Sequence, residues 1–362
     1  MRRVIAALAV LGALAGAQFA FGGSEQATTW DVAVGEQGKP PAGTPKGATL
    51  NGFFPGRLEV NAGDRVRFTS FGFHTVSYLA GRRPPPPFSP AQGATYTGIT
   101  DAAGQPFHFD GQPAFAFTES VFGPFGPKVI AGSRPASSGA LFATSPKKPG
   151  RVTFTFPKTG GFKLVCQIHP GMEIDVVVKR KGARVQSAAD VAGLVKAETD
   201  AAWKEARQLA GVRPPANTIV MGIDGRVREG GRLALLDFYP DLTTVKAGTP
   251  VRFTVRSPSE VHNVGLGPEK YIERFMRQTD LFPMGPGSKN QVTPVFIYGS
   301  DPRGTAYEPA LHGNGFFATP LADGARGGLP NTVRVTFAKP GKYKFLCMIH
   351  GPDMAAAIRV TR

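Results

Sequence analysis

Two cysteines, the only ones in the 362-residue chain, each begin the same short motif. A histidine stands three positions after each cysteine, a methionine follows that histidine, and one further histidine lies far upstream. The two sets are His74, Cys166, His169 and Met172, and His262, Cys347, His350 and Met354. A thiolate, two imidazoles and a weakly held thioether are the ligands of a type 1 (blue) copper site. The sequence therefore predicts two such sites, alternating between Cu(I) and Cu(II).

The spacing within each motif suits a single metal ion. Cys-x-x-His brings a thiolate and an imidazole to one centre from a tight loop. Pro170 and Gly171 in one motif, and Gly351 and Pro352 in the other, allow the sharp reversal that would direct the methionine at the same centre. The upstream histidine must come from a neighbouring strand end, so only a folded chain completes the site. A disulfide between the two cysteines is the alternative, but it would leave the matched histidine and methionine spacings as coincidence.

The elements that must position these residues occur twice in the chain. Apolar Val66 and Phe68 alternate with Arg65 and Arg67, which is typical of a strand with one buried face. Several segments of the first half can be aligned with segments of the second, as in an internal repeat. The matching segments are 30–35 with 217–222, 53–63 with 238–248, 65–69 with 250–254, and 151–165 with 332–346.

Composition and length favour an all-β fold of two domains. The 46 glycines and 33 prolines indicate short strands joined by many turns. We predict two tandem antiparallel Greek-key β-sandwiches, with hairpin turns at 157–161 and 339–342, joined by one α-helix. The expected boundaries are 28–180 for the first domain, 181–214 for a linker that contains the helix, and 215–362 for the second domain.

The linker helix is predicted over residues 187–210. Ser187 can cap its start, with Asp190 three residues later, and Gly211 can close its end. One face is an apolar stripe and the opposite face is charged. The stripe contains Val191, Leu194, Val195, Ala202, Ala206 and Leu209, and the charged face contains Lys196, Glu198, Lys204 and Arg207. We expect the helix to pack against one domain and to set the distance between the two, with a mobile tether as the alternative.

The N-terminus and the overall charge bear on location and partners. Arg2 and Arg3 precede an apolar run that ends in Ala-x-Ala, which predicts a secretory signal peptide over residues 1–17. We therefore expect an extracytoplasmic chain, in the periplasm, the cell envelope or secreted, without stable membrane insertion after cleavage; an uncleaved anchor is the alternative. The net charge of +16 suggests either a generally basic surface or attraction to acidic redox partners. We find no nucleic-acid-binding motif.

On these motifs, each half resembles the cupredoxins, the family of plastocyanin, azurin and amicyanin. The first ligand loop is similar to that of amicyanin, and the second, one residue longer, is closer to that of plastocyanin. The resemblance implies cupredoxin-type sandwiches, the two ligand sets given above, and single-electron transfer between a donor and an acceptor protein. In the family the residue after the upstream histidine is often Asn, which ties the two ligand loops together. Asn263 fits this pattern and Thr75 does not, so the hydrogen bonding around the first site is expected to differ.

Multidomain copper oxidases and nitrite reductases are the alternative class. In those families a histidine adjoins the blue-copper cysteine, whereas Val165 and Gln167 flank one cysteine here and Leu346 and Met348 flank the other. Outside the two ligand sets the chain has only His108 and His312, which we expect to be solvated surface groups. We therefore predict an electron carrier and not an enzyme. Periplasmic copper handling is a further alternative, but the chain lacks the Met- and His-rich tracts typical of that function.

Both halves carry long insertions between the upstream histidine and the cysteine. These stretches are rich in Phe, at Phe107, Phe109, Phe115, Phe117 and Phe316 among others. Long loops without secondary structure tend to be functional or disordered. Two interpretations are open: the Phe side chains anchor the loops to the sandwich, or they form an apolar docking rim around the copper-bearing end.

Overall fold

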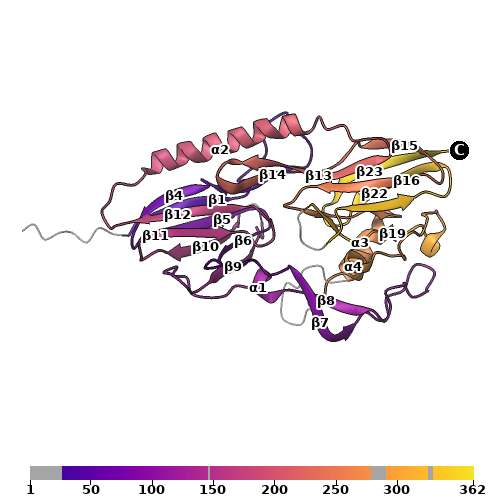
Figure 1. The fold of residues 1–362 in the computed structure, drawn as a ribbon, viewed down its shortest axis with the longest axis horizontal. Helices are drawn as coiled ribbons and strands as arrows, with labels where there is room; N and C mark the ends of the chain where they lie inside the picture. The colour runs from indigo at the N-terminus through magenta and orange to yellow at the C-terminus, as the bar shows by residue number, and fades with distance from the viewer. Residues whose placement is uncertain (1–26, 146, 279–290, 325–328) are drawn as a thin grey trace, which may run out of the picture.

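The computed structural model describes residues 27–362 except 146, 279–290 and 325–328. The predicted signal peptide, residues 1–17, lies outside the described residues. In the described part, two β-sandwiches lie side by side, each built from two sheets (Figure 1). No helix among the described residues has the length and apolar character that crossing a lipid bilayer requires.

The first sandwich holds most strands of the first half. Its sheets have the orders β10-β5-β1-β3 and β4-β12-β11-β6-β9. The bounds are β1 (Thr29–Val34), β3 (Phe53–Phe54), β4 (Arg57–Asn61), β5 (Arg65–Ser70), β6 (His74–Tyr78), β9 (Ala136–Leu141), β10 (Gly150–Thr155), β11 (Gly160–Val165) and β12 (Glu173–Lys179). Phe68 of β5 packs edge-on against Phe53 and Phe154, with ring centroids 6.0 and 6.3 Å away. The predicted alternation thus fills the core between the two sheets.

The second sandwich repeats this plan. Its sheets have the orders β2-β14-β13-β16-β21 and β15-β23-β22-β18-β19. The bounds are β2 (Ala48–Asn51), β13 (Thr218–Val227), β14 (Gly231–Tyr239), β15 (Leu242–Lys246), β16 (Pro250–Arg256), β18 (Gly265–Leu266), β19 (Phe317–Ala318), β21 (Thr332–Thr336), β22 (Gly341–Cys347) and β23 (Gly351–Thr361). The prediction of an all-β chain with two tandem sandwiches and a connecting helix is confirmed.

Two details of the prediction are wrong. The sandwiches are not purely antiparallel, because β1 pairs with β5 and β4 with β12 in parallel, as do β13 with β16 and β15 with β23. The turns at 157–161 and 339–342 are not hairpins, because each connects strands of opposite sheets, β10 to β11 and β21 to β22. Alternation along a strand shows which face is buried but does not show which strand lies beside it.

One strand of the first half belongs to a sheet of the second. β2 pairs antiparallel with β14, with Leu50 opposite Leu233 and Asn51 opposite Arg232. Leu50 and Leu233 are buried in a cluster that also contains Phe54 and Trp203. The two halves therefore share backbone hydrogen bonds as well as apolar contacts.

The predicted linker helix is present as α2 (Ala188–Leu209). Ser187 accepts a hydrogen bond from the Asp190 backbone N–H at 3.1 Å, and the Asp190 carboxylate accepts one from the Ser187 N–H at 2.9 Å. This reciprocal capping box is what the sequence predicted. The expectation that the helix packs against one domain is wrong: it contacts β13 and β14 of the second sandwich and β3 of the first. Glu198, predicted on the solvated face, is buried and accepts a hydrogen bond from Gly56 N–H at 3.0 Å.

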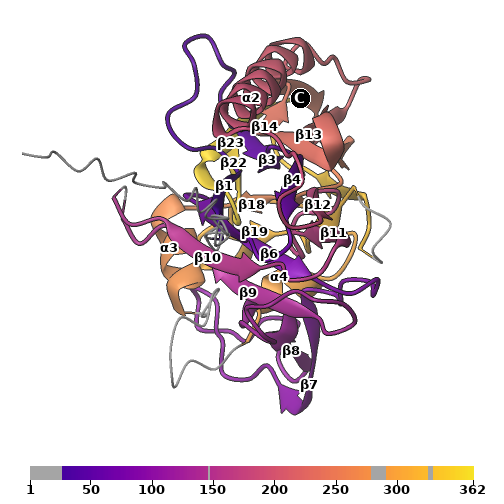
Figure 2. The ribbon, with the colours of Figure 1, turned by 90° about the vertical axis from the view of Figure 1, so that its left-hand side faces the viewer.

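The insertions pack against each other across the two halves. The first contributes the paired strands β7 (Phe88–Thr95) and β8 (Pro113–Phe117) and helix α1 (Glu119–Phe122); the second contributes α3 (Glu269–Gln278) and α4 (Pro294–Tyr298). Further short elements are β17 (Val261–His262), β20 (Ala322–Asp323) and the 3-10 turns η1 (Arg228–Gly230) and η2 (Leu311–Gly313). Figures 1 and 2 show α2 on one side of the molecule and β7–β8 on the opposite side.

The Phe residues of the insertions form a third core, which we call the inter-half core. Phe107 of the first half lies 5.8 Å from Phe275 and 5.9 Å from Phe316 of the second, measured between ring centroids. Phe109 and Phe296 are buried in the same cluster. The Phe side chains thus anchor the insertions, as the first interpretation expected, but they do so against the insertion of the other half as well as against sandwich residues such as Leu346.

Candidate metal centres

The first predicted ligand set comes together at one end of the first sandwich. His74 is the first residue of β6, Cys166 directly follows β11, and His169 lies in the loop before β12. The Nδ1 atoms of His74 and His169 are 3.0 Å apart, and Cys166 Sγ lies 3.4 Å from His169 Nδ1. All three side chains are buried. Three donor atoms of the kinds that bind copper therefore converge at a point that is buried from solvent.

The second set repeats this geometry in the second sandwich. His262 ends β17, Cys347 ends β22, and His350 directly precedes β23. Cys347 Sγ lies 3.4 Å from His350 Nδ1 and 3.9 Å from His262 Nδ1. In each centre the donor atoms lie within 4.8 Å of one another.

Two glycines fix the upstream histidines. A Cβ added at Gly35 would overlap His74 Nε2, and one at Gly222 would overlap His262 Nε2. Both glycines have positive φ, of 72° and 66°, which side-chain-bearing residues rarely adopt. Each Nε2 is therefore pressed against backbone, and each Nδ1 is directed at the cysteine. Sequence reasoning missed this role, although Gly35 and Gly222 stand at matching positions of the repeat.

The first ligand loop is closed by backbone hydrogen bonds. Cys166 N–H donates to the Met172 carbonyl at 2.9 Å, and Met172 N–H donates to the His169 carbonyl at 3.0 Å. Met172 is buried in the core that contains Cys166, and Met354 in the core that contains Cys347. The structure thus brings together the cysteine and both histidines of each set, and places each methionine in the adjoining core.

Thr75 and Asn263 tie the ligand loops in the same way. Asn263 Oδ1 accepts from Met348 N–H at 2.9 Å, and Thr75 Oγ1 accepts from Gln167 N–H at 2.7 Å. The Thr75 backbone N–H also donates to Cys166 Sγ at 3.3 Å. Thr75 departs from the Asn pattern, yet it makes the corresponding tie, because a hydroxyl oxygen one residue after the histidine reaches the same backbone position.

The charge state of the donor set suits a soft metal ion. Burial alone would raise the pKa of the Cys166 thiol, but the charges and hydrogen bonds of His169 and His74 hold it well below its ordinary value. His350 and His262 lower the pKa of Cys347 in the same way, against the effect of burial. The thiolate is the form that binds metal. A buried thiolate, two imidazole nitrogens and a nearby thioether side chain fit a type 1 copper ion.

A single carboxylate lies between the two centres. Glu260 Oε1 is 3.2 Å from His169 Nε2, and Glu260 Oε2 is 3.5 Å from His350 Nε2. Asn51 Nδ2 donates to Glu260 Oε1 at 2.7 Å. Burial alone would raise the pKa of this carboxyl, yet the two histidines hold it well below its ordinary value. Nothing in the sequence marks Glu260, because its partners come from the other half and from a distant loop.

The two remaining histidines differ: His108 is exposed, as expected, but His312 is largely buried, so the expectation of a solvated surface group is wrong for His312. His312 lies between Asp101 and Asp301, with its Nδ1 3.1 Å from one carboxylate and its Nε2 3.1 Å from the other. His108 Nδ1 lies 2.9 Å from the Ser300 carbonyl. The contacts of His312 with Asp101 and of His108 with Ser300 cross between the insertions of the two halves. Asp101 and Asp301 lie against opposite nitrogens of the His312 ring, so these donors do not converge on one point; within the described residues, only the two His–Cys–His groups are arranged to hold a metal ion.

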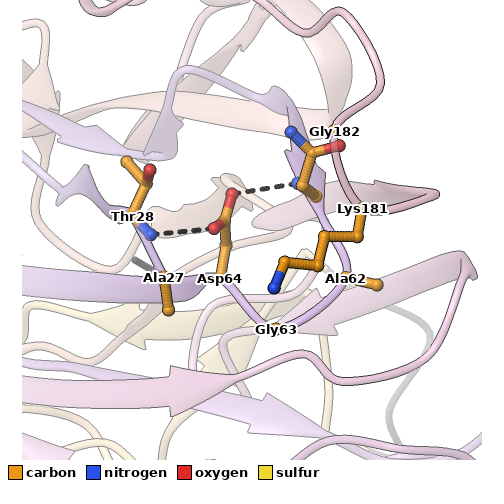
Figure 3. A pocket seen from close by; sticks show the side chains of 8 residues that line it. Ala27, Thr28, Ala62, Gly63, Asp64, Lys181 and Gly182 are labelled. Atoms are coloured by element: carbon orange, nitrogen blue, oxygen red, sulfur yellow. Dashed lines mark hydrogen bonds between the residues drawn. The ribbon is translucent and has the colours of Figure 1, made fainter. Parts of the chain in front are cut away.

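A surface hollow of about 250 Å³ near the start of β1 is separate from both centres. Figure 3 shows Asp64 at its wall, accepting hydrogen bonds from backbone N–H groups. These come from Thr28 and Asn61 at 2.9 and 3.0 Å, and Trp30 Nε1 donates to the same carboxylate at 2.9 Å. Asp64 is thereby fully engaged in holding the strand ends together.

Neither a protein-family model nor a curated protein matches the sequence of this chain. Solved structures do match. Auracyanin A, a "blue" copper protein from Chloroflexus aurantiacus, is 23% identical, with a TM-score of 0.24, over 41% of this chain and 100% of that chain. Oxidized plastocyanin from Dryopteris crassirhizoma is 19% identical, with a TM-score of 0.21, over 40% of this chain and 99% of that one. A purple cupredoxin from Nitrosopumilus maritimus is 14% identical, with a TM-score of 0.21, over 41% and 100%.

The chain's own features carry the assignment of its fold. Each half is a two-sheet sandwich in which the cysteine and one histidine come from the loop between the last two strands, and the other histidine from a neighbouring strand end. The chain therefore has a cupredoxin-like fold, present twice.

Proposed function

We propose that this chain is an extracytoplasmic electron carrier with two type 1 copper sites. The observation that carries the proposal is the convergence, in each half, of a buried cysteine sulfur and two imidazole Nδ1 atoms within 4.8 Å. When bound, copper supplies one-electron exchange between Cu(I) and Cu(II). Met172 and Met354, buried in the cores that contain their cysteines, would supply the thioether ligands.

The chain's own groups would hold the ligands in one arrangement. Gly35 and Gly222 fix the orientation of the upstream imidazoles, and the Thr75 and Asn263 side chains fix one ligand loop against the other. The cysteines stand at strand ends, where sheet hydrogen bonds restrict the backbone. A ligand set held in this way changes little between two oxidation states, which favours electron transfer over release of the metal.

Partners and location are part of the same proposal. A signal peptide would direct the chain out of the cytoplasm, and we propose one redox protein as donor and another as acceptor. The net charge of +16 favours partners with acidic docking surfaces. Binding to a chosen acidic redox protein should then weaken as the salt concentration rises, because exposed charges are screened.

The test begins with metal analysis and a visible spectrum of the purified protein. We expect two coppers per chain and an intense thiolate-to-Cu(II) absorption that disappears on reduction. Cys347→Ser should remove the copper and the absorption of the second site alone, and Cys166→Ser those of the first. One copper per chain, or colourless Cu(II), would contradict the assignment of one of the halves.

A second measurement separates the carrier from the alternatives. Turnover of oxygen or nitrite with an artificial donor should stay at the level of free copper. Sustained turnover that requires both cysteines would favour a two-domain copper oxidoreductase of the nitrite reductase or multicopper oxidase kind. Rapid loss of Cu(I) to a competing chelator would favour copper handling.

A further inference from the structure

The loop histidine of each centre faces the other half of the molecule. His169 and His350 turn Nδ1 toward their own cysteine, at 3.4 Å in both centres, and turn Nε2 toward Glu260. The upstream histidines cannot make such a link, because their Nε2 atoms are pressed against Gly35 and Gly222 within their own halves. Among the ligand nitrogens, only these two point from one centre toward the other.

The Glu260 carboxylate lies between the two histidine rings and contacts both of them. Each of its carboxylate oxygens lies against a different ring, at 3.2 and 3.5 Å, and its side chain is 12% exposed. An imidazole that binds metal through Nδ1 keeps a proton on Nε2, which it can donate to a carboxylate. One carboxylate can therefore accept a hydrogen bond from a ligand of each centre at the same time.

The position of Glu260 is itself determined by both halves. Asn51, on the shared strand β2, donates to Oε1 at 2.7 Å. From the second half, Asp224 accepts a hydrogen bond from the Ser259 backbone N–H at 3.0 Å and another from the Ser257 hydroxyl. These groups hold the segment that precedes β17, so the carboxylate has little freedom to leave the two rings.

We propose that Glu260 couples the two centres, so that they exchange an electron within one chain. This inference rests on the proposed function, because it requires copper at both sites. The His169 ring, the Glu260 carboxylate and the His350 ring form a continuous route of polar contacts, at 3.2 and 3.5 Å, between the ligand sets. One electron moves along it: one copper is oxidised from Cu(I) to Cu(II), the other is reduced from Cu(II) to Cu(I), and no net proton or atom is transferred. Glu260 acts here as a positioning residue.

The test uses the full-length, copper-loaded protein and follows the two sites separately. Freeze-quench EPR distinguishes the two Cu(II) signals once each has been recorded alone in Cys166→Ser and Cys347→Ser. After a pulse that delivers less than one electron per chain, the wild type should redistribute the electron between its sites at a rate independent of protein concentration. Glu260→Gln should slow this step by about 10- to 100-fold, the usual effect of removing a partner of a metal-ligating histidine.

Glu198→Gln is the matched control. Glu198 is also buried, and its carboxylate also accepts a hydrogen bond across an internal boundary, from Gly56 N–H of the first half to the linker helix, but it contacts neither ring. Its substitution should leave the redistribution rate unchanged. Asn51→Ala keeps the carboxylate and removes its 2.7 Å hydrogen bond, so it should give an intermediate redistribution rate. It replaces Glu260→Gln in this test if that variant does not fold.

A second readout does not depend on electron transfer. In the diamagnetic Cu(I) protein, the Nε2 protons of His169 and His350 should give two NMR signals that exchange slowly with water. Both signals should be present in Glu198→Gln, and at least one should be lost in Glu260→Gln, because an amide oxygen can accept from only one of the rings.

The outcomes separate the two proposals. Equal redistribution rates in the wild type and in Glu260→Gln, with both coppers bound, would overturn the role of Glu260 and leave the proposed function standing. A wild-type rate that scales with protein concentration would do the same, because exchange would then occur between molecules. A wild type that binds no copper would overturn the proposed function and this inference with it.

Discussion

At the scale of single residues, the metal ligands could be predicted and their surroundings could not. Cys166 and His169 stand within one short loop, and the same loop recurs at Cys347, so spacing alone pointed to them. Glu260 touches residues of the other half, and the role of Gly222 is visible only once the His262 ring lies above it. Contacts between distant segments leave no local pattern in a sequence.

The glycine under each upstream histidine leads to a prediction. Gly222→Ala should weaken copper binding at the second site by about 10- to 100-fold and leave the first site intact, because the new methyl group would displace the His262 ring. Copper titration followed by visible absorption measures this effect.

Gly248→Ala is the matched control for that substitution. Gly248 also has a positive φ, of 79°, but a Cβ there would meet nothing within 4 Å. Both variants should lose about 1–3 kcal/mol of unfolding free energy to backbone strain. Equal copper affinity in the two variants would show that the Gly222 backbone does not position His262.

At the scale of elements, periodicity predicted which segments are strands and where the helix lies. The capping residues Ser187 and Asp190 marked the start of α2 because their bonds are local. Pairing was harder to predict: β2 looked like part of the first half, yet its partner is β14. Parallel pairs and crossings between sheets depend on the global path of the chain, which alternation does not record.

Helix α2 should be a main source of cohesion between the halves. Trp203 is 7% exposed and packs in the cluster that contains Leu50 of β2 and Leu233 of β14. Trp203→Ala should lower the unfolding free energy by about 3–5 kcal/mol, as expected for a large buried side chain. Lys204→Ala, on the exposed side of the same helix, should change it by less than about 0.5 kcal/mol. Urea unfolding of both variants measures the difference, and similar values would mean that the helix is only loosely attached.

At the scale of the whole molecule, the two insertions are joined by charge as well as by the inter-half core. Burial alone would lower the pKa of His312, but hydrogen bonds and charges of Asp301 and Asp101 raise it above its ordinary value of 6.5. Burial alone would raise the pKa of Asp101, but hydrogen bonds from Gln105 N–H, His312 and Ala103 N–H lower it. The raised pKa of His312 and the lowered pKa of Asp101 both favour the charged His312–Asp101 pair in the folded state.

This arrangement predicts how stability depends on pH. A raised histidine pKa contributes stability that is complete below about 6.5 and is lost as pH rises through the folded-state value. A lowered carboxyl pKa contributes stability that is complete above the ordinary value of 3.8 and is lost as pH falls through the folded-state value. His312→Gln should therefore cost most, about 2 kcal/mol, in the mildly acidic range between these limits.

Denaturant unfolding of the wild type and His312→Gln at a series of pH values tests this expectation. The difference between them should shrink toward both ends of the range. Lys339→Gln, which breaks an exposed pair with Glu308, is the control and should cost less than about 1 kcal/mol. A cost for His312→Gln that does not vary with pH would mean that its bonds are not those of a charged ring.

Strand β2 has a consequence for how the protein is made. During synthesis, residues 48–51 leave the ribosome well before β14, the strand that they must meet. Until then one edge of β2 carries unpaired N–H and C=O groups, a surface on which other chains can add. However much of the first repeat folds before the second emerges, it presents this edge until β14 is available. The later half of the chain thus protects the earlier half from aggregation, and a ribosomal pause between the repeats would prolong the vulnerable period.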